Sequence, residues 1–329
     1  MKKLAILLAL LLLTGCGLTS KDTKPAQGDF TKLKVYAATG RGLAFSTDSG
    51  ASWVHYQKTK KTELADDHLL SLFIVDDKTF WAGTYRGLSI TTDNAKTWVS
   101  YTVQNGLGGN EINDLAIYNK VLYAGTNGGL SVSTDNAKTW QNISINDGLN
   151  SNKINDVLID NNIIYLATTK GLCVSTDNAK TWKSFVITNN VNIANKIFVD
   201  KDNLYISTEK GLFISEKKAI SFKKLMTDGF EDFLSKRINT FYIDNEGNWW
   251  LGTNEGLARS NNQGKGWRVY DVSDGINAST INDISVNGLM VFAATNKGLA
   301  VSNDGGESWV TYNKDEGLKS LTLKKIIIR

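Results

Sequence analysis

Residues 122–140 read LYAGTNGGLSVSTDNAKTW, and close relatives of this stretch occur six more times along the chain. Every copy ends on an aromatic residue, and these residues stand 40 to 45 positions apart: Trp53, Trp98, Trp140, Trp182, Phe222, Trp267 and Trp309. Self-similarity at a period of about 40 to 45 residues is typical of proteins built as an array of like units. The repeat therefore has to be interpreted before any site.

Each repeat is predicted to contain four short strands. In the copy above, residues 122–126 and 130–133 are apolar and β-branched runs on either side of a glycine turn at 127–129. A third strand follows a second turn at residues 139–143, and residues 112–117 supply a strand upstream. No helical periodicity separates these runs, so four antiparallel strands per period predict a blade of a β-propeller.

The two ends of the chain are predicted to close the ring. Residues 34–39 begin the first repeat, but nothing upstream of them offers an innermost strand. At the other end, residues 323–328 stand where residues 281–286 stand in the previous repeat. We therefore predict an all-β fold, a seven-bladed β-propeller of four-stranded antiparallel blades that spans residues 31–329. The C-terminal strand joins the first blade and removes a free sheet edge.

The first sixteen residues predict export. Lys2 and Lys3 precede an apolar run at residues 4–13, which is shorter than a membrane span of about 20 residues and is typical of a secretory signal. Residues 13–16, Leu-Thr-Gly-Cys, resemble the lipobox of bacterial lipoproteins. The resemblance implies cleavage before Cys16 and attachment of diacylglycerol to its sulfur. An ordinary secretory peptide with a chance cysteine is the alternative.

The predicted organisation is then a signal peptide at residues 1–15, the lipidated Cys16 with a flexible polar tether at residues 16–30, and the propeller. The lipid would hold the protein on a membrane of the bacterial cell envelope. Gly17 rather than Asp follows the cysteine, so the outer membrane or the cell surface is expected rather than the inner membrane.

The composition argues against several kinds of partner. The chain holds 37 Lys and Arg against 33 Asp and Glu, and this balance, together with export, argues against nucleic acid. Cys173 is the only cysteine besides Cys16, so no disulfide is expected within the exported part. A small buried apolar group is predicted at Cys173, because Ser131 and Phe213 fill the same position in sister repeats. His55 and His68 lack the spacing of metal ligands, and no metal or cofactor is expected.

The second turn of the repeat resembles the Asp-box of the BNR repeat, Ser-x-Asp-x-Gly-x-Thr-Trp, which is found in sialidases and in many non-enzymatic propellers. The first copy fits it with Ser46, Asp48, Gly50, Ser52 and Trp53. The aspartate is expected to accept backbone N–H bonds across the turn, and the tryptophan to pack between sheets, so both are interpreted as structural rather than catalytic. The residues given this role are Asp48, Trp53, Asp93, Trp98, Asp135, Trp140, Asp177, Trp182, Trp267, Asp304 and Trp309.

Two repeats depart from this turn. In the fifth, residues 215–222 read SEKKAISF, without the aspartate or the tryptophan. In the sixth, Asn262 stands where aspartate is expected.

Other parts of the period resemble the two-component regulator propeller repeat. The resemblance rests on residues 147–156, 248–257 and 274–283. In that family the propeller is the exported sensor half of a histidine kinase. This sequence shows no membrane helix and no kinase segment after the repeats, so we expect only ligand or partner binding to carry over.

The topology of a blade predicts which face binds. The turn between the second and third strands lies on the same face as the loops between blades, around the mouth of the central channel, and the Asp-box turns lie on the other face. Five of the seven turns on the first face carry a cation and two an acid. An anionic or sugar-like ligand, or an acidic loop of a partner, is therefore expected there, and ordinary solvated turns are the alternative. The predicted ligand-binding residues are Arg41, Tyr85, Arg86, Lys170, Lys210, Glu255 and Lys297.

Two more features concern the channel. Asparagines recur at one position of the first strand, where hydrogen bonding between blades is favoured over a ring of free amides: Asn113, Asn155, Asn195, Asn239 and Asn282. The long loop at residues 225–237 contains Met226, Phe230, Phe233 and Leu234. We interpret it as a lid or as locally packed chain, with a partner patch as the alternative.

The functional prediction is an exported, lipid-anchored, non-catalytic binding or scaffold module for a protein partner or an anionic or glycan ligand. A sialidase-like, glycan-active hydrolase is one alternative, disfavoured because the Arg-Ile-Pro stretch of sialidases is absent and seven blades rather than six are counted. The other alternative is a membrane-complex assembly factor that resembles the photosystem II assembly propeller.

Overall fold

A computed structural model describes residues 33–218, 220–226 and 229–329. The predicted signal peptide, the lipidated Cys16 and the tether lie outside the described residues. None of the helices in the described ranges is long and apolar enough to cross a membrane.

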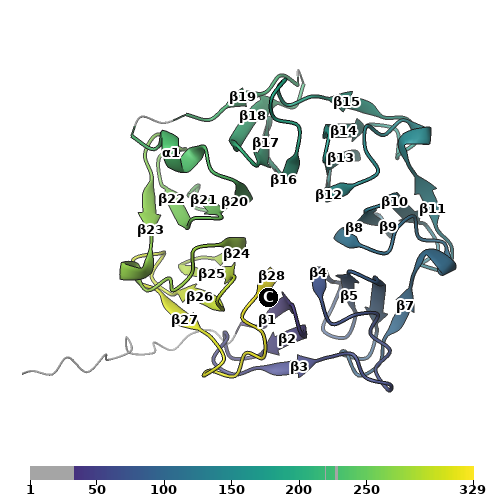
Figure 1. The fold of residues 1–329 in the computed structure, drawn as a ribbon, viewed down its shortest axis with the longest axis horizontal. Coiled ribbons are helices and arrows are strands. Elements are labelled where there is room, and N and C mark those ends of the chain that lie inside the picture. Colours follow the sequence, from purple (N-terminus) through teal and green to yellow (C-terminus); the bar gives the residue numbers. More distant parts are fainter. Residues whose placement is uncertain (1–32, 219, 227–228) are drawn as a thin grey trace, which may run out of the picture. The chain divides into compact units, whose positions relative to one another are not determined.

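Seven four-stranded antiparallel sheets surround a central channel (Figure 1), which confirms the predicted fold. The innermost strands are β4 (Leu69–Ile74), β8 (Ile112–Tyr118), β12 (Ile154–Asp160), β16 (Ala194–Asp200), β20 (Ile238–Ile243), β24 (Ile281–Asn287) and β28 (Leu323–Ile328). The second strands are β1 (Val35–Thr39), β5 (Phe80–Thr84), β9 (Val121–Thr126), β13 (Ile163–Thr168), β17 (Asn203–Thr208), β21 (Trp249–Thr253) and β25 (Met290–Thr295).

The outer half of each sheet is shorter. The third strands are β2 (Gly42–Ser46), β6 (Gly87–Thr91), β10 (Gly129–Ser133), β14 (Gly171–Ser175), β18 (Gly211–Glu216), β22 (Leu257–Ser260) and β26 (Leu299–Ser302). The outermost strands are β3 (Val54–Tyr56), β7 (Val99–Tyr101), β11 (Gln141–Ile143), β15 (Lys183–Phe185), β19 (Lys223–Lys224), β23 (Arg268–Tyr270) and β27 (Val310–Tyr312). Blade 1 holds β28, β1, β2 and β3, and blades 2 to 7 follow in chain order.

The core lies between neighbouring sheets rather than at one centre. The second strands are the most deeply buried, and β5, for example, is buried along its whole length. Both faces of such a strand pack on side chains, so its sequence is nearly continuous in apolar and small residues. The hairpin to the third strand turns at a glycine with positive φ, and at Gly129 a Cβ atom would lie 2.3 Å from the carbonyl oxygen of Ile143. Only glycine fits this approach without displacing backbone.

The predicted closure is confirmed in blade 1. β28 pairs with β1 in an antiparallel register that joins Val35 to Ile328 and Ala37 to Ile326. Beyond the strand, the backbones of Lys34 and Arg329 exchange hydrogen bonds of 2.9 and 3.0 Å. The Arg329 guanidinium also donates to the Ile74 carbonyl of blade 2. Figure 1 shows the yellow end of the chain in the same sheet as its purple start.

The strand-one asparagines bond neighbouring blades together, as the sequence favoured. The side-chain amide of Asn113 donates to the Ile154 carbonyl of the next blade at 2.8 Å, and Asn282 donates to Leu323 at 2.7 Å. The same bond recurs at Asn155, Asn195 and Asn239. In three blades the next residue is an aspartate that accepts a backbone N–H of the same neighbouring strand: Asp114 from Val157, Asp156 from Ile197 and Asp283 from Ile326.

A β-bulge allows two consecutive side chains to reach the same neighbour. In β8 the pairing register with β9 shifts between Ile112 and Asp114, so the intervening Asn113 is left out of the ladder. The same shift occurs at the start of every innermost strand from β4 to β24. A bulge re-aims the side chain it carries, so an Asn-Asp pair forms one clamp between blades instead of pointing to opposite faces.

The turns between the third and outermost strands are held by aspartates, and we call these aspartate turns. In blade 3 the Asp135 carboxylate accepts the Thr139 backbone N–H at 2.9 Å and the Thr139 hydroxyl at 2.6 Å. The Ser133 hydroxyl donates to the same carboxylate and accepts from Ala137. Asp48, Asp93, Asp177 and Asp304 make the same bonds. Their bonding is local to the turn.

Replacement of Asp135 is expected to destabilise its blade in a graded manner. Asp135→Ala removes the acceptor and should lower the thermal unfolding midpoint by a few degrees. Asp135→Asn should lower it less, because Asn262 already fills this role in blade 6, where it accepts from Gly266 at 2.9 Å. Equal midpoints for the alanine variant and the wild type would show that the carboxylate does not hold the turn.

Acid should remove the difference between Asp135→Ala and the wild type. Hydrogen bonds from the Thr139 hydroxyl and backbone lower the pKa of Asp135 to about 2. A carboxylate with a lowered pKa stabilises the folded state above its unfolded pKa, about 3.9 for aspartate, and that contribution is lost as the pH falls through the folded value. The midpoints of the two proteins should therefore converge between about pH 4 and pH 2.

The long inter-blade loop is locally packed rather than free. Residues 231–234 form the short helix α1 (Glu231–Leu234). Leu234 is fully buried, and Phe230 and Phe233 pack against the same core between blades 5 and 6. Met226, by contrast, is 52% exposed. Local packing therefore accounts for most of the apolar residues that the sequence singled out.

Candidate functional site

The two faces of the ring carry different parts of the repeat. The backbone N–H of Thr169, in the turn after β13, donates to the carbonyl of Lys153, which precedes β12. Asn254 and Arg237 make the same contact in blade 6. The turns after the second strands therefore lie beside the starts of the innermost strands, around one mouth of the channel. The aspartate turns follow the third strands and lie on the opposite face.

A cavity of about 440 Å³ lies in this mouth, and we call it the mouth cavity. Its wall is formed by the strand-one asparagines and by residues at the starts of the innermost strands. The cationic side chains that line it are Lys153, Lys196, Arg237 and Lys324. Glu209 is the one carboxylate among the described lining residues.

The cations of the mouth cavity differ in how far they are neutralised. Lys153 lies 3.3 Å from Glu111, and Arg237 lies 3.6 Å from Glu209. Arg237 also donates to the amide oxygen of Asn239 at 3.0 Å. These pairs are solvent-exposed, so each contributes little to stability. Their carboxylates leave part of each cation's donor capacity open to a ligand.

A layer of buried charges closes the floor of the mouth cavity. Lys196 lies 2.6 Å from Asp156 and 3.8 Å from Asp114, and Lys325 lies 3.4 Å from Asp283. These five residues occupy the same position in five innermost strands, which is why they meet at one depth of the channel. We call them the charge layer. The side chain of Asp156 is only 6% exposed and that of Lys196 is 24% exposed.

Burial and charge oppose each other in this layer. Burial alone would lower the pKa of Lys196, but the carboxylates of Asp114, Asp156 and Asp283 outweigh it and raise that pKa. The carboxylates around Lys196 therefore favour its charged form. Burial raises the pKa of Asp156, Lys196 opposes the rise, and the charge of Asp114 adds to it. The two lysines of the charge layer do not fully neutralise the negative charge of its three carboxylates.

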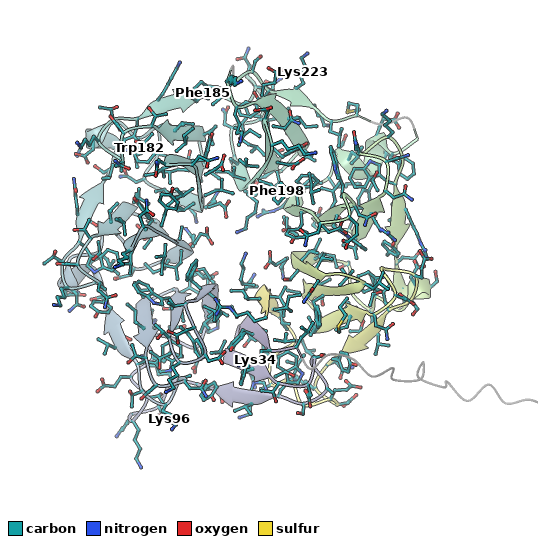
Figure 2. All side chains as sticks on the ribbon, turned by 180° about the vertical axis from the view of Figure 1, so that it is seen from behind. Lys34, Lys96, Trp182, Phe185, Phe198 and Lys223 are labelled. Atoms are coloured by element: carbon teal, nitrogen blue, oxygen red, sulfur yellow. The ribbon has the colours of Figure 1, made fainter. Side chains whose placement is uncertain are left out.

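Another cavity lies on the other side of the charge layer. This second cavity of about 390 Å³ opens toward the aspartate-turn face, and Phe73, Phe198 and Tyr242 line it. Figure 2 shows Phe198 near the centre of the ring, whereas Trp182 and Phe185 lie farther out. The two cavities thus differ in chemistry. Cations and amides line the mouth cavity, whereas apolar side chains and the carboxylates of the charge layer line the second cavity.

The predicted ligand-binding residues lie on the mouth-cavity face but outside the cavity. All seven are exposed at the tips of their turns: Arg41, Tyr85, Arg86, Lys170, Lys210, Glu255 and Lys297. Arg86 lies 3.3 Å from Asp66, and Glu255 lies 3.1 Å from Lys236. Lys210 donates to the Asn190 carbonyl at 3.3 Å. They surround the mouth of the channel as separate side chains.

Sequence reasoning missed the cations that line the mouth cavity. A readable signal exists, because Lys153 and Arg237 each directly precede the apolar-Asn pair that starts an innermost strand. The position before that pair faces the mouth in blades 4 and 6 alike. The charge layer was also missed, although its residues directly follow the recurring asparagine position.

Other candidates for chemistry are not brought together. Cys173 is fully buried, as expected, and burial raises the pKa of its thiol. His55 contacts the Gly317 carbonyl, and His68 pairs with Asp66. Within the described ranges, no three His, Cys, Asp or Glu side chains form a group suited to a metal ion.

Comparisons with known proteins agree with the architecture. The family model described as two component regulator propeller matches residues 232–255, which include the two inner strands of blade 6 and all of α1 except Glu231. No curated protein matches the chain in sequence. Among solved structures, the extracellular domain of a putative hybrid two component system from B. thetaiotaomicron is 18% identical with a TM-score of 0.65, and the match covers 79% of this chain and 37% of that one.

Two further structures differ in how much of their length is matched. YCF48 bound to D1 peptide is 15% identical with a TM-score of 0.62, covering 92% of this chain and 97% of that one. The GH74 xyloglucanase from Xanthomonas campestris is 12% identical with a TM-score of 0.68, covering 86% of this chain and 52% of that one. The chain thus spans about half or less of the length of that extracellular domain and of the xyloglucanase. At these identities the likeness shows the fold alone: the chain is a seven-bladed β-propeller with a two component regulator propeller repeat at residues 232–255.

Proposed function

We propose that this propeller is a non-catalytic binding module that takes an anionic ligand, an acidic sugar or an acidic loop of a partner protein, in the mouth cavity. The observation that supports this proposal most is that three cationic side chains line one cavity: Lys153, Arg237 and Lys324. Concave sites with a few converging polar groups are the usual places for small ligands. The exposed tips, Arg41 and Arg86 among them, would surround the ligand and attract it electrostatically.

The wall of the cavity is rigid, which favours binding. Each strand-one asparagine is fixed by a hydrogen bond to the next blade, as between Asn155 and Ala194 at 2.7 Å. The charge layer forms a floor that cannot be rearranged without breaking buried ion pairs. A preorganised site loses little conformational entropy when a ligand binds.

The arrangement of carboxylates disfavours the hydrolase alternative. Glycoside hydrolases act through a pair of carboxyl groups that flank the bond to be cleaved. The mouth cavity holds Glu209, which is paired with Arg237. When the purified protein is incubated with xyloglucan, the reducing sugar released should not exceed that of a heat-inactivated control. Release of sugar above that control would favour the hydrolase alternative over the binding module.

We also propose the lipid anchor at Cys16 and a place on a bacterial envelope membrane, on the strength of the lipobox resemblance. Partition of the full chain into a detergent phase tests this. Cys16→Ser should move the protein into the aqueous phase, and an unchanged partition would remove the anchor from the proposal.

Affinity capture from solubilised membranes tests the proposed binding face. Lys153→Ala combined with Arg237→Ala should abolish recovery of the partner or glycan that the wild type retains. Lys138→Ala combined with Lys180→Ala removes two cations from the exposed aspartate turns and should leave recovery unchanged. If both double variants lose recovery equally, net charge rather than a specific site explains binding. If the Lys153→Ala, Arg237→Ala variant loses no recovery, the proposal is refuted.

The same capture distinguishes the assembly-factor alternative. The match to YCF48 bound to D1 peptide extends over nearly the full length of both chains. Recovery of a membrane-complex subunit by the wild type, through the mouth cavity, would favour assembly. Recovery of an acidic glycan without protein would favour a ligand-binding role.

A further inference from the structure

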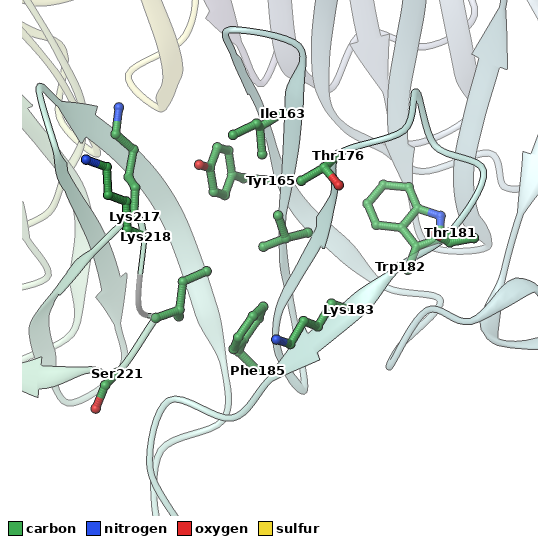
Figure 3. A pocket seen from close by; sticks show the side chains of 12 residues that line it. Ile163, Tyr165, Thr176, Thr181, Trp182, Lys183, Phe185, Lys217, Lys218 and Ser221 are labelled. Carbon is green, nitrogen blue, oxygen red and sulfur yellow. The ribbon is translucent and has the colours of Figure 1, made fainter.

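A third cavity lies far from the channel, between blades 4 and 5, and we call it the rim groove. It measures about 580 Å³ and is lined by Tyr165, Trp182 and Phe185 together with Lys183, Lys217 and Lys218. Figure 3 shows Lys217 and Lys218 on one wall and Trp182, Lys183 and Phe185 on the other. Its residues lie at the aspartate-turn end of the strands, so it is separate from the mouth cavity.

The rim groove lies where blade 5 lacks an aspartate turn. In blade 3 the Ser133 hydroxyl accepts from Ala137, four residues on. In blade 5 the equivalent Ser215 accepts from Ser221, six residues on, at 2.7 Å. Lys217 stands where the aspartate would be and pairs instead with Asp160 of blade 4 at 2.9 Å. Blade 5 therefore lacks the hydrogen bonds that hold the turn of blade 3.

A regular pair of blades provides an internal comparison. The equivalent space between blades 2 and 3 measures about 180 Å³, a third of the rim groove. Repeat alignment places Val99 there where the rim groove has Lys183, and Asn136 where it has Lys218. Enlargement and positive charge thus occur at the same pair of blades. Neither change is needed to form a blade, since blades 2 and 3 fold without them.

The side chains that line the rim groove favour one class of ligand. The floor is aromatic and aliphatic, with Tyr165 and Phe185 beside Ile163 and Ile220. Lys183 lies over the Phe185 ring, 5.2 Å from its centroid, and the structure gives its ammonium no carboxylate partner within the described ranges. Among the described residues that line the groove, several side chains carry hydroxyls and none carries a carboxylate or an amide. Sugar hydroxyls would lack their usual acceptors, whereas a large apolar side chain flanked by carboxylates would find both an apolar floor and cations.

We propose that the rim groove binds an extended acidic segment of a partner protein. An aromatic or large aliphatic side chain of the segment enters between Tyr165 and Phe185, and neighbouring carboxylates pair with Lys183 and Lys218. This site is independent of the mouth cavity, so the full chain presents two binding surfaces on different faces of one ring.

A display library of random peptides about ten residues long, selected on the immobilised full chain, tests the proposal. The wild type should enrich sequences in which Phe, Trp or Leu is flanked by Asp or Glu. Lys183→Glu combined with Lys218→Glu should weaken binding of an enriched peptide by about tenfold or more, because like charges now face its carboxylates. Lys96→Glu combined with Lys138→Glu changes net charge equally on the regular blades and should bind as the wild type does.

A second variant changes the shape of the groove and keeps its charge. Ile220→Trp places a larger side chain in the groove while Lys183, Lys217 and Lys218 stay in place, and it should abolish binding by filling the space. The proposal is overturned if no acidic-apolar peptides are enriched, or if the charge-reversed protein binds them as tightly as the wild type. Displacement of the peptide by a galacturonate trimer would overturn it in favour of an acidic sugar.

Discussion

Deletion of residues 321–329 is expected to leave the domain unfolded or aggregated at temperatures where the intact chain is folded. The deletion removes β28, whose Leu323 and Ile326 are buried in the core between blades 7 and 1. Burial of each such side chain stabilises by about 1.5–3 kcal/mol, and the backbone ladder with β1 adds to this. The loss exceeds about 5 kcal/mol, the lower end of the stability of a whole domain. It also exposes β1 as an unpaired edge.

Two controls make this deletion interpretable. Removal of Arg329 alone deletes its hydrogen bonds to Lys34 and Ile74 but leaves β28 intact, and should lower the unfolding midpoint only modestly. A synthetic peptide of residues 321–329, added in excess to the truncated chain, should restore folding by completing blade 1. A truncated protein with the midpoint of the intact chain would refute closure by the C-terminal strand.

Lys196→Met is expected to destabilise the propeller by roughly 3–5 kcal/mol, because removal of one partner leaves buried carboxylates without a compensating charge. Asp156 loses a contact of 2.6 Å, and Asp114 and Asp283 lose an attraction that contributes to the raised pKa of Lys196. Lys324→Met is the matched control, since Lys324 lies in a neighbouring position of the channel but is exposed. Its unfolding midpoint should stay close to that of the wild type.

The defect of Lys196→Met should shrink in acid. Burial raises the pKa of Asp156 already in the wild type, and without Lys196 to oppose the rise, that pKa should increase further. A carboxyl whose folded pKa exceeds its unfolded value binds protons on folding, so stability increases as the pH falls from neutral toward the unfolded value of about 3.9. The deficit relative to the wild type should therefore be smaller at about pH 5 than at about pH 7.5. An equal deficit at both would mean that the loss of packing, not charge, explains it.

The repeat made the fold predictable, and the reason is physical. Seven copies of one pattern average out the ambiguity of any single short strand, and each glycine at the start of a third strand marks a turn that other residues cannot make. The position of residues 323–328 in that pattern was enough to predict the pairing with β1. The asparagines at strand one could be assigned to bonds between blades because they recur with the same period.

The mouth cavity was less predictable, because side-chain direction near its wall depends on the β-bulge. Strict alternation would send Asn113 and Asp114 to opposite faces, whereas the bulge lets both bond to β12. The topology of a blade was enough to place the exposed turns after the second strands around the mouth. How deep Lys153 and Arg237 lie in the channel depends instead on where the innermost strands begin. In the rim groove the sequence showed that the fifth turn had changed, and only the packing of two blades shows the space that this change opens.

Site-directed photocrosslinking tests most directly whether the mouth-cavity face is the binding face. A photoreactive benzoylphenylalanine at Thr169 would lie at the wall of the mouth cavity and leave every cation in place, and the same group at Thr134 would lie in an aspartate turn on the opposite face. After irradiation with solubilised membranes, the first protein should carry an adduct to an anionic ligand or acidic partner, and the second should carry none to it. An adduct from position 134 without one from position 169 would contradict the proposed function.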